Sequence, residues 1–197
     1  MKAKLKAIAS ILCLLTMSIV LASCSLFAGE EGAVHDAVDN AMKIFKNAEN
    51  SDAVSFADQG VLDSLNVYGV DANEFLGYCF KHLEWEIGDI NLSGDTGTVA
   101  LSVTNVNLGT ALERAGEQFE EFAATHEAQE LFNAEGESAL VKKLFSFLYE
   151  LIDSGELETT TADVTLEVFK NEDGTWDINP DNNEFYSALY GGADFSI

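Results

Sequence analysis

The chain has 197 residues and a formal net charge of −24 at pH 7, because it carries 34 acidic residues and only ten basic ones. A surface this acidic repels the phosphates of nucleic acids and the anionic headgroups of membranes, so nucleic acid and flat membrane binding are both disfavoured. Cationic small molecules, basic peptides and divalent ions are the compatible partners.

The N-terminus has the pattern of a bacterial export signal. Lys2, Lys4 and Lys6 precede an uncharged, mainly apolar segment over residues 7–23. This segment is shorter than the ~20 residues that an apolar helix needs to span a bilayer, and no basic cluster follows that would stop transfer. The pattern therefore predicts a signal peptide over residues 1–23.

The end of this segment resembles the lipobox of bacterial lipoproteins. Leu21 is aliphatic, Ala22 and Ser23 are small, and Cys24 follows them. The resemblance implies cleavage between Ser23 and Cys24, with a diacylglyceryl group on the Cys24 sulfur. Two acyl chains are about what stable anchoring requires. We therefore expect a protein that is lipid-anchored in the cell membrane and faces outside the cytoplasm; an uncleaved membrane helix or an ordinary secretory signal is the alternative.

Removal of residues 1–23 would leave 174 residues, which suits one domain with its own core. These residues keep all 34 acids and seven basic residues, a formal charge of −27. With Cys24 lipidated, Cys79 has no intramolecular partner, and its apolar neighbours predict a buried thiol. We assign residues 24–32 to a tether and residues 33–197 to a single α+β domain.

Three helices are predicted at the start of this domain. Apolar residues recur at helical spacing over residues 33–48, with charged residues on the other faces. Ser51 offers an N-cap to a short helix from about residue 52 to about residue 60. Asp71, with a glutamate three residues later, resembles a capping box for a helix over residues 72–82.

The period then changes to that of strands. Alternation over residues 84–87 and 98–104, joined by a turn at residues 93–95, predicts a hairpin with one apolar face. A second hairpin is predicted over residues 163–178, with its turn at residues 171–174.

Between the two hairpins the pattern is helical over residues 109–154. An interruption at residues 133–136 predicts a two-helix arm, inserted between the second and third strands and ended by Gly155. After the second hairpin we expect a short C-terminal helix with Asp181 as its N-cap.

Motifs in both hairpins carry a resemblance to a known family. They are Gly94-Asp95-x-Gly97-x-Val99 with Val103-Thr104-Asn105, and Lys170-x-x-x-Gly174-x-Trp176-x-Ile178. With the helices before them, these motifs resemble small Gram-positive lipoproteins of unknown function that have a domain like nuclear transport factor 2. The resemblance implies a cone-shaped α+β fold, in which N-terminal helices pack on a curved four-stranded antiparallel sheet. It implies no catalytic residues.

The cone of this fold holds a pocket in some relatives. Tyr78, His82 and Trp85 are our candidate lining residues for such a pocket. None of the three histidines has a spacing typical of a zinc site or a nucleophilic triad. The acidic residues after the second hairpin begin like a calcium loop but lack its glycine and its closing glutamate. We therefore assign no catalytic residue, no metal and no cofactor.

The second half of the arm has an apolar surface too wide for one neighbouring helix to cover. Val141, Phe145 and Ile152 widen its apolar arc beyond the main stripe. If the sheet covers the other side of this arc, the arm is a lid over the cone, which is the reading that we favour. Otherwise, these three residues form an exposed site for a partner, ringed by acids.

These observations predict a membrane-anchored extracytoplasmic lipoprotein, monomeric, whose domain binds a cationic small molecule or a protein without catalysis. Two alternatives stay open. One is an enzyme of hydrolase or isomerase type, which would need a carboxylate or histidine of perturbed pKa in the pocket of the concave sheet. The other is a structural envelope protein that docks a partner through its arm.

Overall fold

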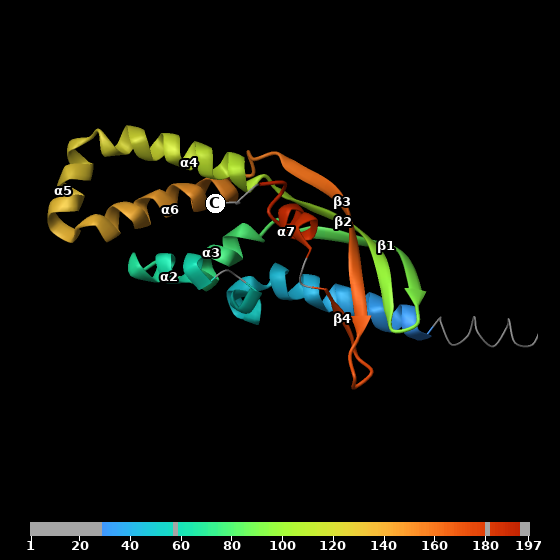
Figure 1. Ribbon diagram of the computed structural model, residues 1–197. Helices are drawn as coiled ribbons and strands as arrows, with labels where there is room; N and C mark the ends of the chain where they lie inside the picture. The colour runs from blue at the N-terminus through green and yellow to red at the C-terminus, as the bar shows by residue number, and fades with distance from the viewer. Residues whose placement is uncertain (1–28, 57–58, 180–181, 194–197) are drawn as a thin grey trace, which may run out of the picture.

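The backbone forms one four-stranded antiparallel sheet with helices against one of its faces (Figure 1). The structure is a computed structural model that describes residues 29–56, 59–179 and 182–193. The strands, in sheet order, are β1 (Glu84–Ser93), β2 (Thr96–Val106), β3 (Thr159–Lys170) and β4 (Trp176–Ile178). The helices are an N-terminal helix (29–46), the short η1 (Ala48–Asn50) and η2 (Asp52–Phe56), and α2 (Gln59–Val67), α3 (Ala72–Cys79), α4 (Leu108–Ala123), α5 (His126–Glu135), α6 (Glu137–Ser154) and α7 (Asn183–Leu189). The predicted class, α+β with helices on a curved four-stranded antiparallel sheet, is confirmed.

The sheet has one dry face, as the alternation in the sequence predicts. Val99 and Leu101 of β2 are at most 1% exposed. Antiparallel pairing places Val99 opposite Leu166 and Leu101 opposite Val164 on β3, so the apolar side chains of neighbouring strands share this face. The first hairpin turns at Gly94, whose φ of +65° is a conformation that glycine adopts without steric cost.

The N-terminal helix lies along the dry face (Figure 1). Its apolar stripe of Val34, Val38 and Met42 is fully buried, as the helical spacing predicts. The helix is longer than predicted, because residues 29–32, which we assigned to the tether, are helical. Those four residues bury no apolar side chain, so hydrophobic periodicity could not reveal them.

Two polar contacts hold this helix against the sheet. Trp85 Nε1 on β1 donates a hydrogen bond to Asp39 Oδ1 at 3.1 Å, and Lys170 Nζ on β3 lies 2.6 Å from Glu30 Oε1. The Asp39 carboxylate also pairs with Lys43 one turn later. Asp39 has a pKa below its usual value, mainly because its carboxylate accepts a hydrogen bond from Lys43. The hydrogen bond from Trp85 lowers the pKa of Asp39 further.

Asn105 is a fully buried polar residue where β2 meets α3 and α7. Its Nδ2 donates to the carbonyl oxygens of Cys79 (2.9 Å) and Leu189 (2.7 Å), and its Oδ1 accepts from the backbone N–H of Val106 (2.9 Å). Replacing it with an apolar residue would leave buried carbonyls unpaired. Cys79 is 2% exposed, so the predicted buried thiol is confirmed, and burial raises its pKa.

Two further helix boundaries differ from the prediction. Asn182, not Asp181, is the N-cap of α7: its Oδ1 accepts from the backbone N–H of Phe185 at 3.0 Å. Asp181 itself lies outside the described residues. Asparagine and aspartate cap helices equally well, so the local sequence could not choose between them. The predicted short helix to about residue 60 also differs, because a separate helix, α2, runs from Gln59 to Val67 with Leu65 as its buried residue.

The arm between β2 and β3 has three helices, α4, α5 and α6, so the prediction of two was wrong. The extra break falls at Ala124–Thr125. There the Thr125 hydroxyl caps α5 by accepting from the backbone N–H of Ala128 at 3.2 Å. The arm ends at Gly155, whose φ of +72° is the left-handed helix end that the sequence predicted.

No described helix is long and apolar enough to cross a membrane. The predicted signal peptide, its cleavage point between Ser23 and Cys24, and the lipid site on Cys24 all lie outside the described residues.

Candidate functional site

Aromatic side chains join α3 to α6, and we call this contact the α3–α6 seam. Asp71 fixes the start of α3 by accepting from the backbone N–H groups of the second and third residues after it, as predicted. Phe75 and Tyr78, three residues apart on α3, then face α6. The Phe75 ring meets Phe145 edge-on with centroids 5.5 Å apart, and the Tyr78 ring stacks on Tyr149 at 4.0 Å and 5°.

A shallow hollow opens beside the Tyr78–Tyr149 stack. Its volume is about 470 Å³, and we call it the Tyr149 hollow. It is lined by Tyr78, Ser146, Tyr149, Glu150, Asp153 and Ser154. Five of these residues lie on α6 and project from it at helical spacing, while α3 supplies the sixth, Tyr78. An aromatic floor beside two carboxylates suits a ligand with a positive charge and an apolar part.

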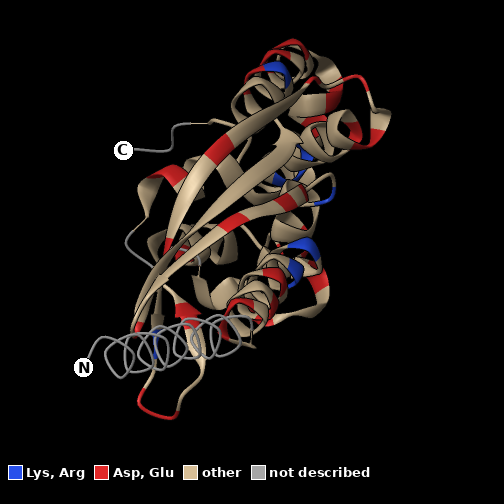
Figure 2. Ribbon diagram, turned by 90° about the vertical axis from the view of Figure 1, so that its right-hand side faces the viewer, with Lys and Arg blue, Asp and Glu red and all other residues tan. Residues whose placement is uncertain are grey.

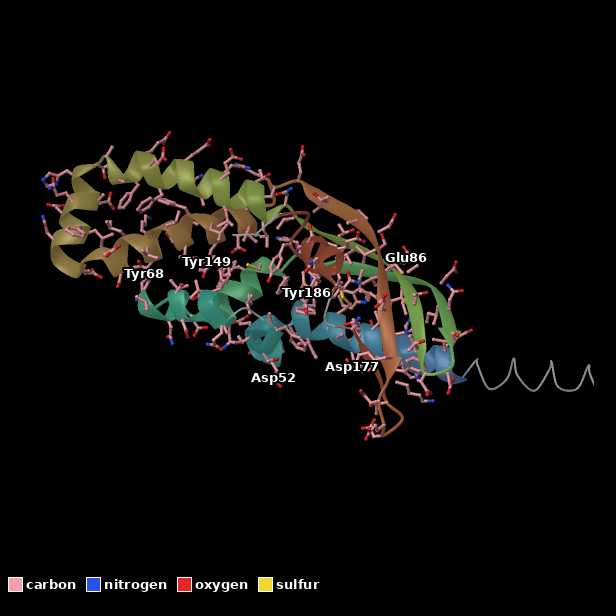
Figure 3. All side chains as sticks on the ribbon, viewed as in Figure 1. Asp52, Tyr68, Glu86, Tyr149, Asp177 and Tyr186 are labelled. Carbon is pink, nitrogen blue, oxygen red and sulfur yellow. The ribbon has the colours of Figure 1, made fainter. Side chains whose placement is uncertain are left out.

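The hydroxyl of Tyr149 is buried and has no hydrogen-bond partner among the described residues. Its burial, together with the nearby charges of Glu74 and Asp71, raises the pKa of Tyr149 well above the usual value. The phenol therefore stays protonated at physiological pH and can donate a hydrogen bond but cannot act as a base. In Figure 3 Tyr149 lies on the side of α6 that faces α3.

Lys81 supplies a cation at the edge of the same hollow. Its Nζ pairs with Asp153 Oδ1 and lies 5.3 Å from the centroid of the Tyr78 ring. The hydrogen bond to Asp153 raises the pKa of Lys81. The ammonium group of Lys81 thus lies between an aromatic face and a carboxylate. An organic cation bound in the hollow would make the same two contacts. Glu150 is exposed and lies on the same side of α6, one helical turn before Ser154.

The charges on the two sides of the molecule differ. Figure 2 shows acidic positions on strands and helices alike, whereas the basic positions gather mainly on the helices. Lys81 follows α3, and Lys142 and Lys143 lie on α6. The lining of the Tyr149 hollow itself contains two carboxylates, Glu150 and Asp153, and no basic side chain.

The structure does not bring the three predicted pocket residues together. Tyr78 lines the Tyr149 hollow, but His82 and Trp85 do not. His82 Nε2 donates to the carbonyl oxygen of Ile152 at 2.9 Å, which ties the end of α3 to the end of α6. Trp85 is tied to the N-terminal helix through Asp39. The concave face of the sheet, where a pocket was expected, is filled by the buried core described above.

Of the three residues proposed as a lid or a partner site, Phe145 packs against α3. Ile152 is 1% exposed, while Val141 and Phe145 are half-buried. The ring of Phe145 rests on Phe75 of α3, and not on the sheet as the favoured lid arrangement would require. The apolar arc of α6 therefore has two neighbours, as its width predicts, but the second neighbour is a helix.

Sequence reasoning missed Tyr149, Glu150 and Asp153. All three lie on α6, and their spacing gives no motif, because Tyr149 gains its role only from the stacked ring of Tyr78 on another helix. A signal was present in the spacing of Phe145 and Tyr149, which puts two aromatic rings on one helical face. Among the described residues no group of three or more His, Cys, Asp or Glu side chains could hold a metal ion.

Comparisons with known proteins bear on the fold. No family model matches the chain, and no curated protein matches it. A solved structure that does match is the "putative lipoprotein (ycdA)" of Bacillus subtilis, at 12% sequence identity and a TM-score of 0.50. The match covers 81% of this chain and 55% of the Bacillus chain, so the present chain spans about half the length of that neighbour. At this identity the likeness concerns the fold alone.

Proposed function

We propose that the chain is a lipoprotein, anchored by a diacylglyceryl group on Cys24 and exposed outside the cytoplasm, whose domain binds a ligand without catalysing a reaction. The observation that carries the proposal is the match to a lipobox at residues 21–24, directly after an export signal. The structural neighbour, described as a putative lipoprotein, supports it.

The anchor is tested by locating two cysteine variants in the producing cell. Cys24→Ala removes the acceptor of the lipid, so we expect the protein to lose labelled fatty acid and to be released from the membrane or kept as an uncleaved precursor. Cys13→Ala is the matched control, because it removes a thiol from the same segment eleven residues earlier and should change neither property. Unchanged labelling of Cys24→Ala would overturn the anchor.

The binding role is supported by the chemistry of the Tyr149 hollow. Its aromatic floor and its carboxylates fit an organic cation, and the contact of Lys81 with Tyr78 and Asp153 is an internal example of that interaction. A neutral Tyr149 and a His82 ring that is hydrogen-bonded to a backbone carbonyl favour binding over proton transfer. We therefore propose a cationic small molecule as the ligand.

Spermidine is a suitable probe for this site. We expect it to bind at about 0.15 M salt, where attraction to distant surface charges is screened within ~8 Å. Glu150→Gln should weaken the affinity by about threefold. Glu135→Gln, which makes the same change of charge on α5, should leave the affinity unchanged. If both substitutions lowered the affinity equally, spermidine would not bind at a specific site. It would instead be attracted by the overall negative charge of the protein.

The proposal includes a domain of the type found in nuclear transport factor 2. A long helix along the dry face of a curved antiparallel sheet supports this, as do the two hairpins in their order along the chain. The three-helix arm between β2 and β3 is an addition to that arrangement, and it carries most of the Tyr149 hollow.

A further inference from the structure

The outer face of the sheet, opposite the dry face, is built from polar side chains in rows across the strands. The register gives these rows directly, since residues paired between antiparallel strands lie side by side on one face. One row is Ser93, Thr96, Phe169 and Asp177, and the next is Asn91, Thr98 and Glu167, which Asn179 extends. A more distant row is Glu86, Ser102 and Asp163.

A second hollow lies over the first two rows, and we call it the Phe169 hollow. Its volume is about 510 Å³. It is lined by Asn91, Ser93, Thr96, Gly97, Thr98, Glu167, Val168, Phe169 and Asn179. These residues come from β1, β2 and β3 and from the end of β4, so regular strands hold the site rather than loops.

Phe169 is the one apolar residue of its row on this face, since Ser93, Thr96 and Asp177 are polar. It is half-buried, yet it does not belong to the hydrophobic core or to the residues packed against it. Its ring contacts no other aromatic ring among the described residues. A phenyl ring in a strand that neither fills the core nor pairs with another ring offers a flat apolar platform to a ligand.

Polar groups with free hydrogen-bonding capacity surround this platform. The amide of Asn91 and the hydroxyl of Thr98 make no hydrogen bond to any described residue. Glu167 accepts from Asn179 Nδ2 through one carboxylate oxygen, at 3.0 Å, which leaves its other oxygen without a described partner. Asp177, labelled in Figure 3, adds a second carboxylate beside Phe169. The hollow therefore combines an aromatic plane, an amide, a hydroxyl and the carboxylate of Glu167, with the carboxylate of Asp177 beside it.

We propose that the Phe169 hollow binds a saccharide with free amino groups, of the glucosamine type. A pyranose ring has an apolar face of C–H bonds, whose partial positive charge is attracted to the negative face of a phenyl ring. Its hydroxyls are both donors and acceptors, which suits Asn91 and Thr98. Its protonated amine pairs with Glu167 or Asp177. The acidic sheet face excludes sulfated, phosphorylated and uronic saccharides, since no basic side chain lines this hollow.

A matched pair of ligands tests the proposal. Calorimetric titration of the full-length chain in detergent micelles would compare the tetrasaccharide of glucosamine with the N-acetylated tetrasaccharide, which has the same ring but no charge. At about pH 6 most of the sugar amines are protonated, so the two tetrasaccharides differ in charge. We expect the glucosamine tetramer to bind, and the N-acetylated one to bind about tenfold more weakly. Equal affinity of the two, or no binding of the glucosamine tetramer, overturns the proposal.

Three variants test the residues. Phe169→Leu keeps an apolar side chain but removes the ring, and should weaken binding of the glucosamine tetramer by about tenfold. Glu167→Gln should weaken it by about fivefold. Glu86→Gln makes the same change of charge in the more distant row of the outer face and is the control, with affinity unchanged. An unchanged affinity of Phe169→Leu would overturn the role of the platform.

Spermine separates a saccharide site from a simple cation site, because it has amines and no ring. Its affinity should be the same for the wild-type chain and for Phe169→Leu. If Phe169→Leu lowers the affinity for spermine as much as the affinity for the glucosamine tetramer, the hollow is a cation site. The saccharide proposal is then wrong. The Tyr149 hollow is also proposed to bind polyamines, so both titrations use chains that carry Glu150→Gln in addition, which weakens binding there.

Discussion

Tyr149 is the side chain on which the candidate site depends most. Its ring forms one half of the stack with Tyr78, and its hydroxyl is buried without a partner among the described residues. A buried hydroxyl that makes no hydrogen bond costs about 1–3 kcal/mol of stability. Few buried polar groups in natural proteins lack a hydrogen bond, so this hydroxyl marks a point where the packing of α3 against α6 is not fully satisfied.

Tyr149→Phe removes this hydroxyl and keeps the stacked ring. We expect the free energy of unfolding to stay the same or to rise by about 1 kcal/mol, because the cost of the unpaired group disappears. Urea denaturation followed by circular dichroism measures the change. Tyr149→Ala is the comparison, since it also removes the ring and should cost about 3 kcal/mol. A loss above about 1 kcal/mol for Tyr149→Phe would mean that the hydroxyl is satisfied after all.

Among the elements, α6 joins the two halves of the helical layer. Its first neighbour is α4 within the arm, and its second is α3 through the seam, where Phe145 meets Phe75. His82 and Lys81, both just after α3, bind Ile152 and Asp153 at the end of α6. The arm is therefore fixed to the rest of the molecule by side chains along half the length of α6.

Phe145→Ala tests this seam. Phe145 is half-buried against two aromatic rings, so we expect a loss of about 3 kcal/mol, the lower end of the range for removing a buried phenylalanine. Phe132→Ala on α5 is the control, because that side chain is 51% exposed and should change stability by less than about 0.5 kcal/mol. Similar unfolding midpoints for the two variants would show that α3 does not support the arm.

The strands could be predicted from the sequence because their alternation is complete. Val99, Leu101 and Val103 point to one face, and the small residues Ala100 and Ser102 occupy the positions between them. The N-terminal helix could be predicted for the same reason, since Val34, Val38 and Met42 are all buried in one stripe. Where one face of an element is entirely dry, the periodicity of the sequence determines the element.

The elements that the sequence did not predict lack a fully buried apolar face. Helix α2 buries only Leu65, and the break before α5 depends on one capping threonine, Thr125. The candidate site was missed in part for a different reason. Tyr78 could be named because it precedes His82 by one helical turn, but Tyr149 lies 71 residues further on, and only packing of α3 on α6 brings the rings together. The spacing of residues within each helix does not reveal which other helix it contacts.

At the scale of the whole molecule, the start of the N-terminal helix and the arm lie at opposite ends. The N-terminal helix starts beside the hairpin turns, where Glu30 pairs with Lys170, and the arm extends away from the sheet at the other end (Figure 1). Gly29 comes five positions after Cys24, a span of at most ~18 Å. If Cys24 carries the lipid, the hairpin end lies close to the membrane and the Tyr149 hollow lies further from it.

The domain should fold without its anchor. Residues 29–197, made without signal peptide or lipid and under reducing conditions, are expected to sediment as a monomer and to unfold in one transition. The physical reason is that one continuous core connects the sheet, the N-terminal helix and α6, and that Cys79 is buried and forms no disulfide. Sedimentation as a dimer, or separate unfolding of the sheet and the arm, would contradict this expectation.

The most direct test of the whole account is the mass of the N-terminal peptide of the mature protein, purified from the membranes of producing cells. We predict that this peptide begins at Cys24 and carries a diacylglyceryl group on the cysteine sulfur, because Leu21, Ala22 and Ser23 precede it in the order of a lipobox. An unmodified Cys24, a peptide that still contains residues 1–23, or cleavage at another position would contradict the account.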